Sequence, residues 1–385
     1  MTDHPRSPTP PLLITEPQDL EQLVARLGAG PRVALDTEAA SFHRYVDRVY
    51  LIQLSSDRET ALVDPLAIAD LGPIGRLLAD AGIEVIFHDA DYDLRMLDRD
   101  YGFRARRIWD TRIAAQLAGE QAVGLSALLE RFFGMRLSKK LQRADWSVRP
   151  LTDEMIAYAA ADTAHLPPLR DLLADRLRAV GRLHWAEEEF LRLEQVRWND
   201  RANGQDAFLD LKGAKLLKPP QLAVLRAVWS WRTRMAQALD RAPFRILANE
   251  LLVALARLAP PTAAALTAVP GMPASIARRY GDQLLAVITQ GLATPEAEWP
   301  RVDRRPRTRP NPEADARFQR LRNLRAVRAP AVGLDPGLVC ANGVLQEIAR
   351  AAPRVPADLD AIPELRRWQR EVLEDEGILR AVRLV

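Results

Sequence analysis

The stretch Val33-Ala34-Leu35-Asp36-Thr37-Glu38 decides how the first half of the chain is expected to fold. Its apolar run predicts a buried β-strand. Because side chains alternate across a strand, Asp36 and Glu38 are expected on one face. Two neighbouring carboxylates repel each other and are costly to desolvate, and a divalent cation such as Mg²⁺ or Mn²⁺ would remove that cost. The alternative is a strand that ends in a polar loop, so the meaning of this stretch depends on the rest of the chain.

The length and composition of the chain indicate a multidomain globular protein. Its 385 residues exceed one ordinary core, and they are 48% hydrophobic and 27% charged. The net charge of +3, with a sequence pI of about 9.1, is weak evidence for binding to a polyanion. Nearly all basic residues are arginine, which suits bidentate phosphate contacts, although a GC-rich genome gives the same bias. Lysine occurs only at positions 139, 140, 212, 215 and 218.

The sequence also indicates a cellular compartment. Cys340 is the one cysteine, which excludes an internal disulfide and a cysteine-based zinc site. Residues 1–12 are rich in proline and are expected to form a disordered leader rather than a signal peptide. No stretch reaches the roughly 18 uninterrupted apolar residues of a membrane span. We therefore expect a cytoplasmic protein without membrane association. We also expect a monomer, although nothing in the sequence itself gives the oligomeric state.

Hydrophobic periodicity predicts an α/β domain over residues 13–205. After one leading helix the elements follow the order β-β-β-α-β-α, and the short links between the first three strands indicate an antiparallel meander. This order is typical of a mixed sheet flanked by helices. The expected helices include 16–27 and 74–78, and the expected strands are 33–38, 49–54, 61–65 and 84–88.

A second acidic cluster follows the fourth strand, in His88-Asp89-Ala90-Asp91-Tyr92-Asp93-Leu94. Asp89 and Asp91 are expected to cap the following helix, because aspartate is a preferred residue at helix N-termini. Asp93 lies one turn further in, where no cap is needed, so it is a candidate functional carboxylate. His88 is either a ligand or a strand-end residue that is hydrogen-bonded to the backbone.

A third acidic cluster lies in the run from Asp153 to Thr163. Thr152 is the expected N-cap, and the alanines of the run predict a strong helix. Tyr158 and Asp162 are separated by four residues, so they share one helix face. The small alanines around them would let that face approach another element closely. The alternative is a surface helix with a Tyr–Asp pair.

Together the three clusters resemble the motifs of the DEDDy-type 3′→5′ exonucleases, whose fold is ribonuclease-H-like. The motifs are Asp-x-Glu on the first strand, an aspartate after a later strand, and Tyr-x-x-x-Asp on a late helix. The run Gln142-Arg143-Ala144-Asp145-Trp146-Ser147-Val148-Arg149-Pro150-Leu151-Thr152 is very similar to a signature of the ribonuclease D family. Leu51-Ile52-Gln53-Leu54 looks like the second strand of that family.

The resemblance implies a role for each residue of the three clusters. Asp36, Glu38, Asp93 and Asp162 would bind two divalent metal ions, Mg²⁺ or Mn²⁺. Asp36 would bridge both ions, Glu38 and Asp162 would bind the ion that activates water, and Asp93 would act largely through water on the second. Tyr158 would be the fifth catalytic residue. It would orient the attacking water rather than act as a free base, because its unperturbed pKa is about 10.

The implied activity is that of a metal-dependent 3′→5′ exoribonuclease, which releases nucleoside 5′-monophosphates from tRNA precursors and other structured RNA. Ala39-Ala40 stands where many relatives carry a bulky residue that lines the pocket for the 3′ end. Phe42, His43 and Tyr45 are expected to supply that contact, and His88 is a further candidate. Two alternatives are a DNA 3′→5′ exonuclease of the same superfamily and a non-catalytic RNA-binding scaffold.

Beyond residue 205 the sequence pattern is all α-helical. Residues 212–293 closely resemble an HRDC domain, the helical module that some helicases share with ribonuclease D. Within it, Arg278, Arg279 and Tyr280 are candidate phosphate and stacking contacts. Residues 294–312 are expected to form an arginine- and proline-rich linker. Residues 313–385 repeat the first unit loosely, which predicts a second, degenerate HRDC domain that serves either packing or RNA binding.

Overall fold

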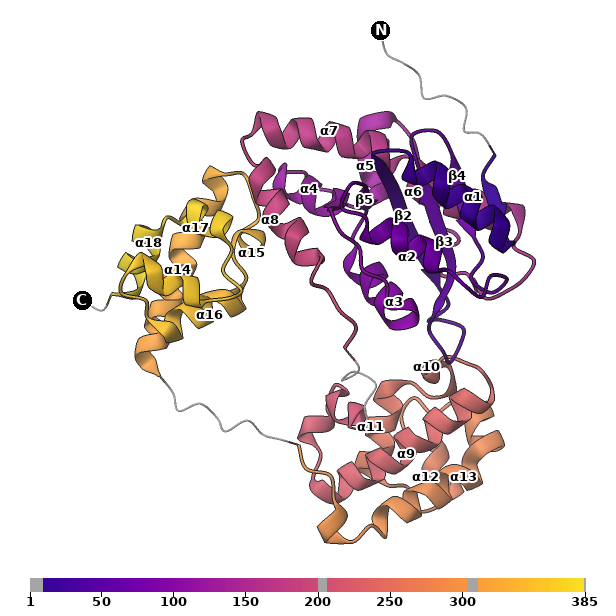
Figure 1. Ribbon diagram of the computed structural model, residues 1–385. Coiled ribbons are helices and arrows are strands. Elements are labelled where there is room, and N and C mark those ends of the chain that lie inside the picture. Colours follow the sequence, from indigo (N-terminus) through magenta and orange to yellow (C-terminus); the bar gives the residue numbers. More distant parts are fainter. Residues whose placement is uncertain (1–9, 200–205, 303–310, 384–385) are drawn as a thin grey trace.

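The computed structural model describes residues 10–199, 206–302 and 311–383. It contains an α/β domain and two helical domains, and Figure 1 shows the helical domain α9–α13 below the α/β domain and the helical domain α14–α18 beside it. We call these the first and second helical domains. The predicted fold class is therefore confirmed. Most of the predicted leader, and residues 200–205 and 303–310 of the predicted linkers, lie outside the described residues. The described part of the 294–312 linker contains the 3₁₀ helix Glu296–Glu298, and its last residue, Pro312, begins α14.

The α/β domain is built on one mixed sheet with the strand order β1-β4-β3-β2-β5-β6. The central strands β2, β3 and β4 pair antiparallel, which confirms the predicted meander, while β5 pairs parallel to β2 and β6 parallel to β5. The strands are β1 Leu12–Ile14, β2 Arg32–Ala39, β3 Val49–Ser55, β4 Thr60–Val63, β5 Glu84–Phe87 and β6 Ile108–Asp110.

The two edge strands of the sheet, β1 and β6, were not predicted. Leu12 belongs to β1, so the sheet begins inside the segment that was expected to be a disordered leader. Each edge strand has three residues and pairs parallel to one neighbour, β1 to β4 and β6 to β5. Such short strands carry too little alternation to be recognised, and their pairing partners are distant in the sequence.

Helices cover both faces of the sheet because alternate residues of β2 pack into different cores. Val33 and Leu35 lie in the core beneath α1–α3, whereas Ala34 lies in the core beneath α4, α5, α7 and α8. The first set consists of α1 Pro17–Gly28, α2 Gly72–Ala79 and α3 Asp91–Tyr101. The second set consists of α4 Thr111–Leu117, α5 Leu125–Phe133, α7 Leu166–Ala179 and α8 Leu183–Leu193.

Helix α6 (Asp153–Ala164) lies against the sheet on the same side as Ala34. Thr152 caps it as predicted, because its hydroxyl accepts a hydrogen bond from the Met155 N–H at 3.2 Å. Ala159 and Ala160 are buried with Leu51 and Leu62 of the sheet, so the small side chains let the helix approach closely. This approach brings the following turn of α6 to the carboxyl-terminal end of β2.

The first helical domain has its own core, which includes Trp231 and Tyr280 at a ring-centroid distance of 5.7 Å. Tyr280 is only 9% exposed, so its predicted role as a base-stacking residue is wrong. Arg278 and Arg279 are exposed on α13. The α-helices of the domain are α9 Pro219–Ala238, α10 Pro243–Ile246, α11 Asn249–Leu258, α12 Ala263–Thr267 and α13 Ala274–Leu292, and its 3₁₀ helices are Ala207–Asp210, Ala214–Leu216 and Glu296–Glu298.

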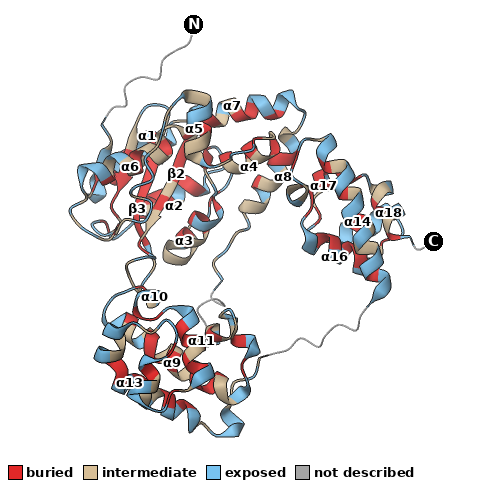
Figure 2. Ribbon diagram, turned by 180° about the vertical axis from the view of Figure 1, so that it is seen from behind, coloured by how far each residue is buried: buried red, intermediate tan, exposed pale blue. Residues whose placement is uncertain are grey.

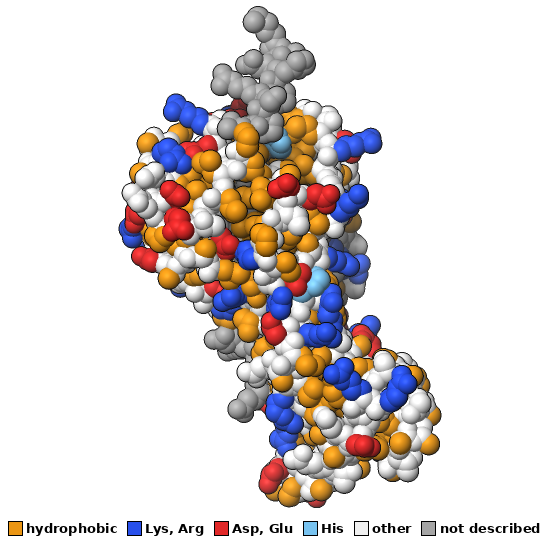
Figure 3. All heavy atoms as spheres, turned by 90° about the vertical axis from the view of Figure 1, so that its right-hand side faces the viewer, with side chains coloured by type: hydrophobic (Ala, Val, Ile, Leu, Met, Phe, Trp, Pro, Cys, Tyr) orange, Lys and Arg blue, Asp and Glu red, His pale blue; other side chains and the backbone are white. Residues whose placement is uncertain are grey.

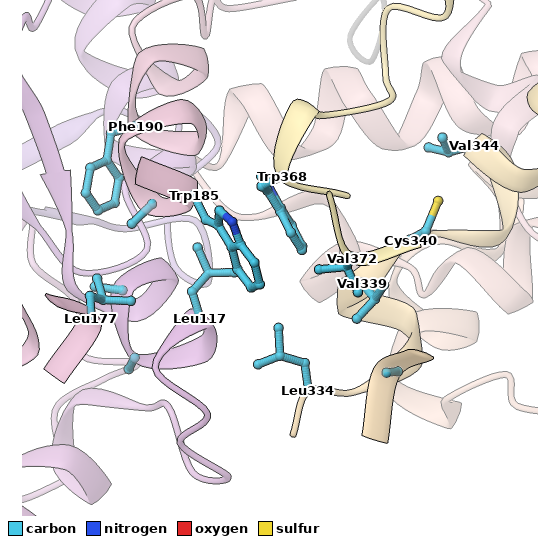
Figure 4. Packing of buried hydrophobic residues seen from close by; sticks show 14 of the residues in the cluster. Leu117, Leu177, Trp185, Phe190, Leu334, Val339, Cys340, Val344, Trp368 and Val372 are labelled. Atoms are coloured by element: carbon cyan, nitrogen blue, oxygen red, sulfur yellow. The ribbon is translucent and has the colours of Figure 1, made fainter. Parts of the chain in front are cut away.

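The second helical domain shares a hydrophobic core with the α/β domain. Trp185 of α8 and Trp368 of α17 stack with ring centroids 5.3 Å apart, and Figure 4 shows the two rings facing each other beside Leu117 and Leu334. The helices of this domain are α14 Pro312–Ala331, α15 Pro336–Val339, α16 Asn342–Ala351, the 3₁₀ helix Pro356–Ala361, α17 Arg367–Leu373 and α18 Asp375–Val382.

Buried residues fill the interior of all three domains, as Figure 2 shows. None of the helices within the described residues is both long enough and apolar enough to cross a membrane.

Candidate active site

The end of β2 and the face of α6 bring three carboxylates together. Asp36 and Glu38 lie on the sheet face that α6 covers, and Asp162 extends from α6 toward them. Their ligand oxygens lie within 4.8 Å of one another. The prediction that the first and third acidic clusters meet is therefore consistent with the structure.

Asp93 reaches the same strand from the opposite face. Helix α3 packs on the Thr37 side of β2, and Asp93 Oδ1 accepts hydrogen bonds from the Thr37 N–H at 3.1 Å and from the Thr37 Oγ1–H at 2.5 Å. Asp93 is 5% exposed and lies outside the compact group of three carboxylates. Thr37 thus fixes the fourth carboxylate close behind the others, a role that the sequence did not suggest.

The carboxylates of this site repel one another in the absence of a cation. Burial raises the pKa of Asp36 to about 6 and that of Asp162 to about 8. Burial, together with the charges of Asp36, Asp162 and Asp93, raises the pKa of Glu38 well above its ordinary value. The charges that act on Glu38 and Asp162 are all carboxylates, so positive charge is what this group lacks.

Gln53 supports the same conclusion from the neighbouring strand. It pairs in register with Asp36 across β2 and β3, so the two side chains lie on the same face. Gln53 is fully buried, and within the described residues neither its side-chain oxygen nor its nitrogen has a hydrogen-bond partner. An unpaired buried amide beside unpaired carboxylates fits a site that binds a hydrated divalent cation. The stretch Leu51-Ile52-Gln53-Leu54 was recognised in the sequence as a family-like strand, but no role was assigned to Gln53.

Tyr158 lies beside the acidic group on α6. Its ring is 5.9 Å from that of Trp146, which is fully buried and comes from the run that resembles the family signature. Burial, then the charges of Asp162 and Glu38, raise the pKa of the Tyr158 hydroxyl above its ordinary value. The hydroxyl therefore stays protonated at neutral pH and is suited to donate a hydrogen bond.

A cavity of about 420 Å³ opens over Asp36, Glu38, Tyr158 and Asp162. It is large enough for one nucleotide, because small-molecule sites typically measure about 300–1,000 Å³. Sequence reasoning missed several polar residues of its lining, although Gln142 opens the family-like run and Lys139 is among the rare lysines. These residues are Arg112, Ser126, Ser138, Lys139 and Gln142.

His88 lines the cavity, but the aspartates that follow it do not cap α3. His88 Nδ1 is 2.9 Å from Thr111 Oγ1, so its partner is a side chain rather than the predicted backbone, and burial lowers its pKa to about 4. Asp89 has a positive φ of 72° and pairs with Arg112. Asp91 lies in the first turn of α3 and pairs with Arg95. The predicted side-chain caps are therefore wrong.

Phe42, His43 and Tyr45 lie in the loop of residues 40–48 between β2 and β3. They contact the first helical domain: the Phe42 ring meets Phe244, the His43 carbonyl accepts a hydrogen bond from the Ala242 N–H at 3.3 Å, and Tyr45 packs against the core of that domain. None of the three lines the cavity over the acidic group. Their role as contacts of the terminal nucleotide stays a prediction.

Comparison with known proteins identifies the family. Residues 11–178 match the 3′-5′ exonuclease domain model, and residues 221–288 and 314–382 match the HRDC domain model. The chain is 32% identical over 372 residues to ribonuclease D of Gluconacetobacter diazotrophicus, covering 96% of this chain and 92% of that protein. The chain belongs to the ribonuclease D family. It is a hydrolytic 3′→5′ exoribonuclease, as the sequence resemblance implied.

Solved structures extend the ribonuclease D assignment to the whole chain. Escherichia coli ribonuclease D superposes with a TM-score of 0.71 at 26% identity, covering 97% of this chain and 99% of that chain. A protein from Bifidobacterium adolescentis superposes with a TM-score of 0.81 at 26% identity, covering 97% of each chain. The tandem helical domains are therefore part of the shared architecture.

Proposed function

We propose that Asp36, Glu38, Asp93, Tyr158 and Asp162 form the catalytic site of this exoribonuclease, with two divalent cations, Mg²⁺ or Mn²⁺, held by the four carboxylates. The observation that carries the proposal is the convergence of three carboxylate ligand atoms within 4.8 Å, with no compensating positive charge from the described residues acting on Glu38 or Asp162. Clustered carboxylate oxygens are the donors that hard divalent cations prefer.

The chemistry follows from the residue types. When bound, the cations would supply an activated water and balance the charge that develops on the phosphate and on the leaving 3′-oxygen. Tyr158, whose hydroxyl keeps its proton, would orient the attacking water by a hydrogen bond. Attack on the phosphorus breaks its bond to the 3′-oxygen, so each cycle would release one nucleoside 5′-monophosphate.

We further propose that the substrates are structured RNAs with an unpaired 3′ end, tRNA precursors among them. This part rests on the related E. coli enzyme, which is described as an exoribonuclease involved in structured RNA processing. The cavity above the acidic group measures about 420 Å³, a volume that matches one terminal nucleotide and so supports removal from an end.

The test uses a 5′-labelled RNA with a single-stranded 3′ tail and a DNA of equal sequence, each with Mg²⁺, Mn²⁺ or EDTA. A ladder of single-nucleotide steps on the RNA, absent in EDTA and in Asp36→Asn, supports the proposal. Asp91→Asn is the matched control, because this carboxylate is exposed and paired with Arg95, and it should cleave at the wild-type rate. Equal or faster shortening of the DNA would replace RNA by DNA as the substrate.

Single-turnover rates separate binding from chemistry. Asp36→Asn and Asp162→Asn should abolish hydrolysis while RNA binding survives, and near-native turnover in either variant would refute the carboxylate assignment. Tyr158→Phe should lose at least about 10²-fold in rate but keep metal binding, the scale of one positioned proton-transfer or orienting group. An unchanged rate would remove Tyr158 from the mechanism.

A further inference from the structure

We propose that Phe42, Phe244 and Arg143 form a stacking platform for an unpaired RNA base that lies upstream of the 3′-terminal nucleotide. This inference rests on the proposed function, since it concerns the strand that leads to the acidic site. The platform combines residues of the α/β domain with a residue of the first helical domain, so neither domain contains it alone.

Exposed aromatic rings are rare in this protein, and two of them meet. All aromatic residues lie in the described part of the chain, and only Phe42, Tyr92 and Phe244 are exposed, at 41%, 47% and 47%. The centroids of Phe42 and Phe244 are 6.0 Å apart with an interplanar angle of 78°. A contact that served packing alone would bury the rings more fully. Their remaining exposed area is suited to a planar ligand.

The third member of the platform adds a planar cation. The Arg143 guanidinium carbon lies 5.1 Å from the centroid of the Phe42 ring. Arginine over an aromatic ring combines a stacking surface with donors for a phosphate group, and single-stranded RNA offers both a base and a phosphate at each step.

The rings are held in place before any ligand binds. Arg44 donates to Asp240 at 3.0 Å, which links the β2–β3 loop to the first helical domain, and to Ser147 at 2.6 Å, which links it to the segment that contains Arg143. His43 Nε2 lies 2.9 Å from the Arg143 carbonyl oxygen. Figure 1 shows the loop after β2 meeting α10 at this junction. A preorganised site avoids the entropy cost of ordering these groups on binding.

The platform is adjacent to the acidic site along two chain segments. Phe42 follows Glu38 by four residues, and Arg143 directly follows Gln142, which lines the cavity over the carboxylates. A strand whose terminal nucleotide occupies that cavity therefore has its next nucleotides close to the platform. The ligand would be a base on the 5′ side of the bond that is cleaved.

The surrounding charge favours a polyanion. Arg143, Arg241 and Arg245 are exposed, and none of them forms an ion pair within the described residues, whereas Arg44 beside them pairs with Asp145 and Asp240. In the view of Figure 3, Lys and Arg side chains gather where the upper and lower parts of the molecule meet. Unpaired arginines beside exposed rings suit the alternating phosphates and bases of a single strand.

The test places 2-aminopurine, whose fluorescence falls when it stacks, at successive positions of a 12-nucleotide RNA bound to Asp36→Asn protein with Mg²⁺. At least one position upstream of the 3′ end should be quenched. The quench should disappear in Phe42→Ala and in Phe244→Ala. Phe318→Ala is the matched control, because it removes a ring that also carries an arginine, Arg322, but lies in the second helical domain, and the quench should persist.

Conservative variants separate stacking from domain packing. Phe42→Tyr should keep the quench and Phe42→Leu should lose it, although leucine preserves an apolar contact with Phe244. If Phe42→Leu quenches like wild type, or if no position is quenched, the platform is refuted. Urea unfolding midpoints equal to that of wild type would show that the alanine variants remain folded.

Kinetics give an independent measure in the otherwise wild-type enzyme. Phe42→Ala should raise KM for the 12-nucleotide RNA by about 10-fold, within the range for loss of one stacked base, and leave kcat unchanged. An active Asp36→Asn would refute the proposed catalytic site, whereas an inactive Asp36→Asn without any quench would refute the platform alone.

Discussion

The protein has carboxylates at two places with opposite surroundings. Between α8 and the second helical domain, Glu189 accepts hydrogen bonds from Arg366 at 3.2 Å and from the Trp368 indole N–H at 2.7 Å. Glu371 accepts from the Trp185 indole N–H at 2.7 Å. At the end of β2, by contrast, Asp36 and its neighbours face one another, and the pKa of each is raised.

The difference separates an interface that stabilises the protein from the proposed catalytic site. A carboxylate with hydrogen-bond donors contributes to a fixed interface, whereas a buried group without them stores an electrostatic cost that a bound cation relieves. The same contrast distinguishes the two helical domains. The second is joined through a shared apolar core, and the first meets the α/β domain through the loop that follows the acidic strand.

The largest expected effect on stability is at the interface with the second helical domain. Trp368→Ala should lower the free energy of unfolding by about 3–5 kcal/mol, because it removes a fully buried ring that stacks on Trp185 and takes away the indole donor of Glu189, which then keeps only Arg366. Urea unfolding measures this loss. Leu216→Ala, at a side chain that is 81% exposed, is the control and should change stability by less than about 0.5 kcal/mol. If the two substitutions had equal effects, the second helical domain would not unfold as one unit with the α/β domain.

The next effect concerns the paired carboxylates themselves. Glu189→Ala should cost about 1.5–3 kcal/mol, the range for hydrogen bonds to a charged group, since Arg366 and the Trp368 indole N–H lose their acceptor. The measurement is urea unfolding, with the exonuclease rate on RNA recorded in parallel. The rate per folded molecule should be unchanged. A loss of rate without a loss of stability would contradict the separation of the two regions.

Ionisation of the acidic site should destabilise the metal-free protein as pH rises. In the metal-free protein, burial raises the pKa of Asp36 to about 6 and that of Asp162 to about 8, against about 3.9 in an unfolded chain. Between these values the folded state holds protons that the unfolded state has released, so the free energy of unfolding falls as pH rises from about 4 to 8.

Urea unfolding in EDTA at pH 5 and pH 8 tests this pH dependence. The wild type should lose at least about 1.4 kcal/mol, the equivalent of one pKa unit. Asp162→Asn should lose less, because it removes one of the titrating groups, and Mg²⁺ should restore stability to the wild type at pH 8 by binding the ionised carboxylates. An identical pH dependence in the two proteins would show that the acidic site is not its source.

The smallest expected effect is at the junction with the first helical domain. Asp240→Asn weakens the partner of Arg44, an ion pair with substantial solvent exposure, and should change stability by less than about 1 kcal/mol. It should nevertheless raise KM for RNA, since Arg44 links the loop of Phe42 to that domain. Urea unfolding and steady-state kinetics on one preparation measure both effects. A large loss of stability with unchanged KM would show that this contact between the domains stabilises the fold and does not contribute to RNA binding.

Local sequence was sufficient where the signal lay within one element. The strand that contains Asp36, the helix capped by Thr152 and the offset between Tyr158 and Asp162 were all correct, because alternation, capping and helical periodicity are local properties. Local pattern was insufficient for Asp89, whose partner Arg112 lies on α4, whereas Asp91 pairs with Arg95 at i,i+4 on α3, a local pattern that the sequence contained but that was passed over for a cap.

The sequence by itself nominated the residues that are proposed to carry the chemistry, because three acidic motifs in a fixed order resemble those of one exonuclease family. The tertiary structure decided how they combine. The sequence did not say which face of the sheet α3 covers. Only the packing of α3 on the Thr37 face of β2 places Asp93 behind Asp36 and Glu38. The pairing of Phe42 with Phe244 joins positions about two hundred residues apart, and only the docking of the first helical domain brings them together.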